Sequence, residues 1–257
     1  MTRKHTKITL ILLLTLSLSI VSCTAPKKST DNDNQISNES YQDAQTNFSE
    51  LKILFKNKQY NDAYSLLKFM TENLPYSRYT KHGKILEIYS YYEQNKFSTA
   101  IKKANKFISS HPLHTQLDYV FYIRAISSFE LNKALYQNLS QIPHIIEINR
   151  NKVRKTFLYF SELAQKYPKS DYFNEAIQKV KILRQVLAEY EINDAYILYD
   201  AAKYEDVIKH LDFMMENFPN SKSIAKALKL EAKAHRMLGN IDTAKSIETN
   251  IRRNFSE

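Results

Sequence analysis

The chain has 257 residues, a formal net charge of +10, one cysteine and two glycines. A single cysteine excludes an intramolecular disulfide and a cysteine-rich metal site. The two glycines, Gly83 and Gly239, lie too far apart to build a phosphate-binding loop or a dinucleotide-binding fingerprint. The positive charge is compatible with nucleic acid or anionic lipid. Because it is spread along the chain, we interpret it as the solvated surface of helices.

Residues 1–22 have the pattern of a secretory signal peptide. Three basic residues precede an apolar and hydroxylated run, residues 8–21, which is shorter than the roughly 20 residues of a membrane-spanning helix. The run ends in Ile20-Val21-Ser22-Cys23, which resembles a bacterial lipobox. The resemblance implies that a diacylglyceryl group is attached to Cys23, that the signal is cut before this residue and that the new amino group is acylated. The resulting three acyl chains exceed the two signals that stable membrane attachment requires. The alternative is a chance cysteine at the end of the signal.

Residues 23–40 are expected to form the lipidated cysteine and a flexible tether. This segment is polar, and Ile36 is its only large apolar residue, so it cannot bury enough surface to fold. Removal of the signal lowers the net charge by three units to +7. Export also argues against a nucleic-acid partner. The residues that follow the tether suffice for one extended domain with a substantial core.

Four prolines mark an internal repeat. Each follows a segment with helical periodicity that a proline cannot continue. An apolar or aromatic anchor stands fifteen residues before each proline, with a small or short residue three positions after the anchor and an apolar residue ten positions after it. The prolines are Pro75, Pro112, Pro168 and Pro219, and the triplets are Tyr60, Ala63, Met70; Phe97, Ala100, Phe107; Val153, Thr156, Leu163; Tyr204, Val207, Met214; and, without a proline, Ile241, Ala244, Ile251.

These triplets resemble the second helix of the tetratricopeptide repeat. They predict an all-α fold, a superhelical stack of about five tetratricopeptide-like helical hairpins whose concave groove holds segments of partner proteins. Longer spacings predict an insertion at residues 132–151 and an extended first helix, about residues 177–199, in the fourth repeat. The N-terminal repeats would span residues 41–131 and the C-terminal repeats residues 152–257. An unrelated helical bundle is the alternative.

The sequence offers no positive support for catalysis. No HExxH motif or nucleophile elbow occurs. His111 and His114 are the nearest approach to a metal-binding pair, but no third ligand is nearby in the sequence. We therefore expect no enzyme, no metal site and no cofactor. Asp118 is predicted to be a helix N-cap.

Several strings resemble the BamD family of outer-membrane lipoproteins. The sharpest is the run from His111-Pro112 through Asp118-Tyr119 to Tyr122-Ile123-Arg124. Residues 74–79, Tyr91-Tyr92, residues 167–172 and residues 187–191 also fit, as do the insertion and the long helix. The chain departs from the family at Ala125, where glycine is usual, and at Asp194 and Leu198, where an apolar residue and a tyrosine are usual.

The resemblance implies an adaptor anchored to the outer membrane by lipid and facing the periplasm. Its N-terminal repeats would bind the C-terminal signal of unfolded outer-membrane proteins, and its C-terminal repeats would dock on a BamA-like β-barrel protein. Aromatic and arginine side chains dominate interface hot spots. The candidate signal-binding residues are Arg78, Tyr79, Tyr89, Tyr91, Tyr92, Tyr119, Tyr122 and Arg124, and the candidate docking residues are Asp194, Lys203, Lys209 and His210. The alternative function is a scaffold lipoprotein for cell-wall or division proteins.

Overall fold

A computed structural model describes residues 30–137 and 146–255, and all regular secondary structure in these ranges is helical. The predicted signal peptide and Cys23 lie outside the described residues. The helices are α1 (Thr30–Lys56), α2 (Tyr60–Asn73), α3 (Arg78–Glu93), α4 (Phe97–Ser110), α5 (Leu117–Leu131), α6 (Ala134–Gln137), α7 (Ile146–Lys166), α8 (Phe173–Asp200), α9 (Tyr204–Asn217), α10 (Ile224–Met237) and α11 (Ile241–Asn254).

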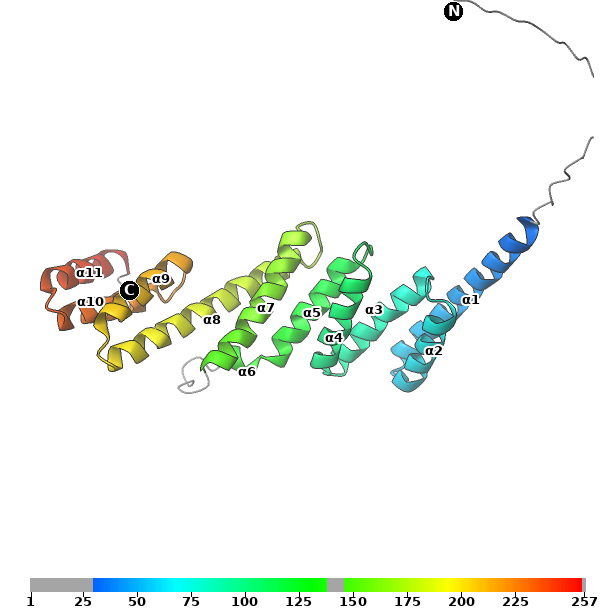
Figure 1. Ribbon diagram of the computed structural model, residues 1–257, viewed down its shortest axis with the longest axis horizontal. Coiled ribbons are helices and arrows are strands. Elements are labelled where there is room, and N and C mark those ends of the chain that lie inside the picture. Colours follow the sequence, from blue (N-terminus) through cyan, green and yellow to red (C-terminus); the bar gives the residue numbers. More distant parts are fainter. Residues whose placement is uncertain (1–29, 138–145, 256–257) are drawn as a thin grey trace, which may run out of the picture.

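The helices form five hairpins that follow one another along the long axis of the molecule (Figure 1). The pairs are α1 with α2, α3 with α4, α5 with α7, α8 with α9, and α10 with α11. From α3 onward, each first helix also packs on the preceding hairpin, as α3 does on α1 and α2. Stacking buries a continuous core that one hairpin could not build alone. The predicted stack of tetratricopeptide-like hairpins is confirmed.

The repeat positions found in the sequence are core positions. The five small residues of the triplets, Ala63, Ala100, Thr156, Val207 and Ala244, are all fully buried. Their short side chains allow the paired helix to approach closely. The apolar residues seven positions later, from Met70 to Ile251, are buried as well. The sequence positions that were identified by their spacing from the prolines are therefore positions of the buried core.

The turns inside the hairpins share a backbone conformation. Lys58, Asn95, Ala202 and Gly239 have φ values between 57° and 80°, and each lies two residues before the first residue of a second helix. This left-handed conformation is free of cost only for glycine. The chain uses a glycine at only one of these four turns, so the other three store some backbone strain.

The N-terminal boundary of the domain differs from the prediction. Helix α1 begins at Thr30, so residues 30–40 belong to a helix and the predicted tether of residues 23–40 is wrong over that stretch. The polar composition argued against folding, but a helix that extends from a packed segment needs no apolar face of its own. Once Leu51 and its neighbours pack against α2, each added residue gains a backbone hydrogen bond without a new nucleation cost.

Helix α8 joins two parts of the core. Leu183 and Tyr190 belong to a cluster shared with α5 and α7, whereas Ile192 and Ala195 belong to a cluster shared with α9 and α10. Its 28 residues confirm the predicted long first helix of the fourth repeat. The predicted insertion contains α6 and the start of α7, and residues 138–145 lie outside the described ranges.

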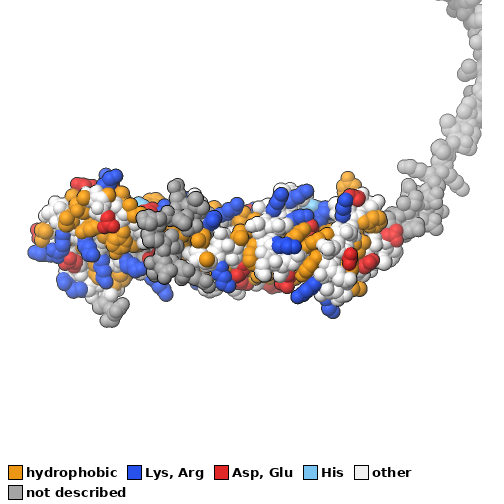
Figure 2. Space-filling view, turned by 90° about the horizontal axis from the view of Figure 1, so that it is seen from below, with side chains coloured by type: hydrophobic (Ala, Val, Ile, Leu, Met, Phe, Trp, Pro, Cys, Tyr) orange, Lys and Arg blue, Asp and Glu red, His pale blue; other side chains and the backbone are white. Residues whose placement is uncertain are grey.

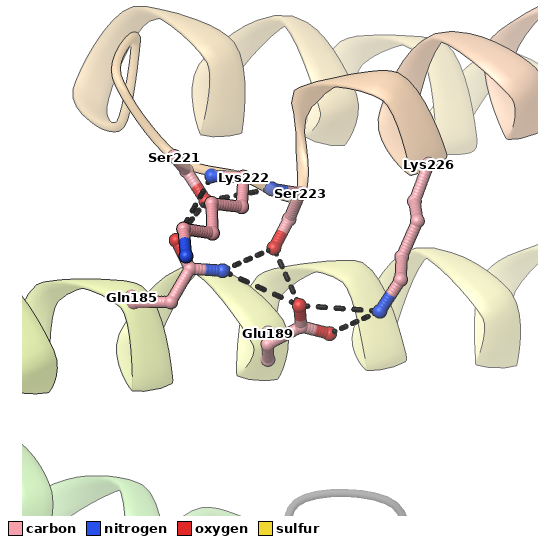
Figure 3. A network of polar contacts seen from close by, with 6 residues as sticks. All are labelled: Gln185, Glu189, Ser221, Lys222, Ser223 and Lys226. Atoms are coloured by element: carbon pink, nitrogen blue, oxygen red, sulfur yellow. Dashed lines mark hydrogen bonds and ion pairs between the residues drawn. The ribbon is translucent and has the colours of Figure 1, made fainter. Parts of the chain in front are cut away.

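Polar side chains tie α8 to the turn between α9 and α10 (Figure 3). Gln185 Nε2 donates to Ser223 Oγ at 2.7 Å, and Gln185 Oε1 accepts from the backbone N–H of Lys222 at 2.9 Å. Ser223, which is fully buried, donates to Glu189 at 2.6 Å, and Lys226 completes an ion pair with the same carboxylate at 3.1 Å. Because these groups satisfy one another, the network fixes the last hairpin against the long helix.

An analogous contact ties α5 to the turn before α8. Ser170 Oγ donates to Asp118 at 2.7 Å. The prediction that Asp118 caps α5 is wrong, because the N-cap is Gln116 and Asp118 is the second residue of the helix, within its first turn. Its carboxylate accepts a hydrogen bond from the turn between α7 and α8 and does not cap its own helix.

Candidate binding surfaces

Four of the eight candidate signal-binding residues lie in one row of aromatic rings, the tyrosine ladder. Tyr89 and Tyr92 come from α3, and Tyr119 and Tyr122 come from α5. The ring centroids of Tyr89 and Tyr119 are 6.4 Å apart. A fifth ring, Tyr172 at the start of α8, lies 5.6 Å from Tyr119 and stacks on Tyr122 at 4.4 Å. The ladder therefore runs across α3, α5 and the N-terminal end of α8, which are the first helices of three successive hairpins.

The ladder lies in acidic surroundings. Tyr122 donates to Glu175 at 2.9 Å. A hydrogen bond to Glu93, together with burial, raises the pKa of Tyr89. Burial raises the pKa of Tyr119 and Tyr122 far above its usual range. The rings are thus neutral hydroxyl-bearing faces, and Tyr89, with 38% of its surface exposed, is accessible to a partner.

Tyr91 belongs to a different surface, the basic groove between α2, α3 and α4. Its ring stacks on that of Tyr64, with centroids 5.1 Å apart. Burial, and then the neighbouring Tyr64 and Glu87, raise the pKa of Tyr91 to about 12. The groove has a volume of about 480 Å³. Its apolar floor is formed by Leu67, Ile88 and Phe107, all of which are buried in the core.

Lysines surround this floor. Lys68, Lys84, Lys103 and Lys106 line the groove with a single carboxylate, Glu87. Lys103 pairs with Glu87 at 2.5 Å. Burial, and then the charge of Lys106, lower the pKa of Lys84. Figure 2 shows Lys and Arg side chains beside hydrophobic strips over the N-terminal hairpins. The groove thus combines an apolar base with an excess of positive charge.

The other three candidates lie apart from both surfaces. Arg78 and Tyr79 are at the start of α3, where the guanidinium lies 4.8 Å from the Tyr79 ring and that ring packs on Phe48 of α1. Ten residues of helix, about 15 Å, separate Tyr79 from Tyr89. Arg124 is only 6% exposed, between the rings of Phe121 and Tyr159.

Arg124 also forms an ion pair. Its guanidinium bonds to Glu162 of α7 at 2.6 Å. Burial alone would raise the pKa of Glu162, but the bonds from Lys166 and Arg124 hold that pKa below its usual value. Arg124 therefore joins α5 to α7 inside the third hairpin, and its buried guanidinium is not available to a partner.

The candidate docking residues fall into two pairs. Lys203 and Lys209 are exposed at the start of the fourth hairpin's second helix. Asp194 and His210 lie in a polar cluster with Glu191, where His210 Nε2 is 3.2 Å from the Glu191 carboxylate. A hydrogen bond to Glu191 raises the pKa of His210. Tyr196, Ile197 and Phe213 add exposed apolar surface to α8 and α9.

Within the described residues, Glu191, Asp194 and His210 are the one set of three potential metal ligands whose ligand atoms lie within 4.8 Å of one another. Arg150 pairs with Asp194. A divalent cation would have to displace this guanidinium and break the contact between His210 and Glu191, so the chemistry of the cluster favours a network of polar contacts and ion pairs.

Comparison with known proteins identifies the family. A model of the YfiO family, described as "Outer membrane lipoprotein", matches residues 33–250. The chain belongs to this family. It is 24% identical over 246 residues to the outer membrane protein assembly factor BamD of Pasteurella multocida, covering 94% of this chain and 92% of the relative. The corresponding protein of Vibrio cholerae is 22% identical over 195 residues, covering 76% of this chain and 80% of the relative.

The BamD factor of Neisseria meningitidis serogroup A is 24% identical over 250 residues, covering 93% of this chain and 91% of the relative. The predicted resemblance to the BamD family is therefore confirmed. In the described part of this YfiO-family chain, no helix is both long enough and apolar enough to cross a membrane.

Sequence reasoning missed several residues of the two surfaces. Tyr172 stands four residues after Pro168, the same position that Tyr79 holds after Pro75, so the repeat register could have found it. Tyr64, Lys84 and Lys106 carry no such signal, because lysines and tyrosines are common along the whole chain.

Proposed function

We propose that this chain is an adaptor in the assembly of β-barrel proteins of the outer membrane, anchored through an acylated Cys23 and facing the periplasm. It acts by binding and not by catalysis. Membership in a family of outer-membrane lipoproteins and similarity to assembly factors over nearly the full length support the proposal. Its partners would be unfolded outer-membrane proteins and a BamA-like β-barrel protein.

The tyrosine ladder is the observation that carries the substrate-binding part of the proposal. Five tyrosine rings from three successive hairpins form a continuous row with centroid spacings of 4.4–6.4 Å. Tyrosines combine a large apolar face with a hydroxyl, and few rotamers are lost when they are covered. An unfolded barrel segment presents alternating apolar side chains with free backbone groups, and both parts of a tyrosine suit such a segment.

The fourth hairpin is the proposed docking surface for the BamA-like protein. Lys203 and Lys209 offer exposed positive charge, and Tyr196, Ile197 and Phe213 offer exposed apolar area. His210 and Asp194 would act indirectly, because His210 joins α9 to α8 through Glu191 and Asp194 joins α8 to α7 through Arg150. Aromatic area with a polar rim is typical of protein–protein interfaces.

Binding of unfolded barrel segments to the purified, acylated protein tests the ladder. Tyr89→Ala removes an exposed ring and should weaken binding about tenfold, the effect of a typical hot spot. Tyr76→Ala is the matched control, since Tyr76 is 90% exposed in the loop before α3 and lies outside the ladder. Equal affinities of the two variants would contradict the assignment.

Depletion of the protein in cells tests the function itself. Outer-membrane β-barrel proteins should fall as a group, while lipoproteins without a barrel persist. Unchanged barrel proteins together with a cell-wall or division defect would refute the proposal in favour of an envelope scaffold of another kind.

A further inference from the structure

We infer that the exposed face of α10, in the last hairpin, is a membrane-contact surface that binds the anionic phospholipid headgroups of the bilayer in which the chain is anchored. The inference rests on the proposed function for the identity of that bilayer, and on the charges and side chains of the last hairpin for its position. Helix α10 lies at the opposite end of the stack from α1 (Figure 1), so the molecule would be attached to the membrane at both ends.

Positive charge is concentrated on the last hairpin. Residues 222–254 contain eight basic and three acidic residues, and Figure 2 shows Lys and Arg side chains over this end of the molecule. Helix α10 has four basic residues and one carboxylate, Glu231, which is buried. Helix α9, in contrast, has four carboxylates and one lysine, Lys209. The positive charge at this end therefore belongs to the last hairpin and not to the one before it.

The basic side chains of α10 form a row, the basic stripe. They lie three or four positions apart, which places them within about 80° of one another around the helix axis. They are Lys226, Lys229, Lys233 and Arg236, and all four are exposed. Lys222, in the turn before α10, is exposed as well and extends the basic stripe. The stripe therefore presents one continuous charged face to the surroundings.

Most lysines of the basic stripe lack a partner within the protein. Lys226 pairs with Glu189 at 3.1 Å. Lys222, Lys229 and Lys233 form no ion pair with any residue that the structure describes. Like charges on one helix face repel one another, so anions from outside must compensate them. A surface that carries closely spaced anionic groups would do so along the whole stripe.

The chemistry of lysine favours a bilayer over a folded partner. Lysine is depleted from the cores of protein interfaces, because its ammonium is strongly hydrated and its long chain loses rotamer freedom when it is fixed. A fluid layer of headgroups does not require fixed side chains. Each lysine close to an anionic leaflet favours contact by about fivefold.

Exposed apolar side chains lie at one end of the basic stripe. Met237, which is 56% exposed, lies about three turns after Lys226 on the same side of α10. Ile241, at the start of α11, is 41% exposed. Apolar side chains beside a row of lysines are typical of helices that enter the headgroup region of a bilayer. The last hairpin thus offers both components of membrane contact.

Fluorescence quenching by spin-labelled lipid tests the inference on the full-length, acylated protein. Met237→Cys carries an environment-sensitive dye, and acylation blocks Cys23, the only native cysteine. The vesicles contain either equimolar phosphatidylcholine and phosphatidylglycerol or phosphatidylcholine alone. The dye should be quenched strongly in the anionic vesicles and weakly in the neutral ones. Molar salt should remove the difference, because it screens the lysines and leaves the acyl chains inserted.

Two triple variants locate the effect. Lys222→Gln with Lys229→Gln and Lys233→Gln should lower the ratio of membrane-bound to unbound α10 about 100-fold in anionic vesicles. The matched control removes three exposed lysines of the third and fourth hairpins, Lys152→Gln with Lys169→Gln and Lys181→Gln. Its ratio should stay within about twofold of the wild-type value, since distant charges are screened.

Equal quenching in the two kinds of vesicle, or an equal loss in the two triple variants, would overturn the inference. So would a photoreactive group at Lys229 that captures an acidic protein in cells and no lipid, because the stripe would then be a protein-docking surface. If the protein does not float with either kind of vesicle, or if Cys23 reacts with the dye, the lipid anchor of the proposed function is itself contradicted. If the chain is anchored but α10 stays away from the anionic bilayer, only the present inference fails.

Discussion

Replacing Arg124 with methionine separates a structural role from a binding role for this residue. Its sequence context made it a candidate for signal binding, but its guanidinium is 6% exposed and lies between two rings. Its contacts join α5 to α7. The centre of the guanidinium is 4.5 Å from the Phe121 ring centroid and 4.2 Å from that of Tyr159. Methionine retains much of the aliphatic chain and removes the charge.

The cost follows from these contacts. The bond to Glu162 at 2.6 Å is charge-assisted, which typically contributes about 1.5–3 kcal/mol. We take the lower half of that range, because the Glu162 side chain is 35% exposed and keeps its pairing with Lys166. The two cation–π contacts add about 1 kcal/mol. The free energy of unfolding should therefore fall by about 2.5–3 kcal/mol.

Thermal unfolding followed by circular dichroism measures the effect. For a domain of this size the loss corresponds to a Tm about 5–10 °C lower. Lys166→Met removes the other, 54% exposed partner of Glu162 and should change stability by less than about 0.5 kcal/mol. An Arg124→Met variant that melts like the wild type, yet no longer binds barrel segments, would refute the structural role and restore Arg124 to the binding surface.

Three further substitutions test local features. Burial, and then the charge of Asp212, raise the pKa of Glu231 to about 7 from 4.5. The folded state therefore holds its proton more tightly, and stability falls as pH rises between these values. In denaturant unfolding, Glu231→Gln should be about 3 kcal/mol more stable than the wild type near pH 8 and equal to it near pH 4. Gly239→Ala should cost about 1 kcal/mol, because φ is 80° there and no atom crowds the new Cβ. Ala202→Gly, at φ 57°, should be neutral or slightly stabilising in the same assay; changes of the same sign at both turns would contradict the strain argument.

The hairpin stack was predictable because its signals are local and repeated. A proline ends each helix, and a small residue must lie where two helices approach, so the spacing of Ala63, Ala100 and Val207 carries the register without any knowledge of distant contacts. The extent of α1 was not predictable in this way. Polar residues can extend a helix that is already nucleated, and composition alone does not reveal it.

The division of the candidate residues into two surfaces also required the structure. Successive residues of a helix point about 100° apart, so Tyr91 and Tyr92 cannot share a face. Which of them faces the ladder depends on how α3 packs against α2, α4 and α5. The burial of Arg124 is equally a matter of packing, since arginine is usually exposed. Sequence reasoning therefore identified the residue types of the site and did not resolve their arrangement.

Photocrosslinking in living cells tests the central claim most directly. A photoreactive amino acid in place of Tyr89, on the tyrosine ladder, should capture several different outer-membrane β-barrel proteins before they fold. The same group in place of Met237, which is 56% exposed in the last hairpin, should not. Crosslinks from residue 89 that contain no barrel protein, or the same set of partners from both positions, would contradict the account.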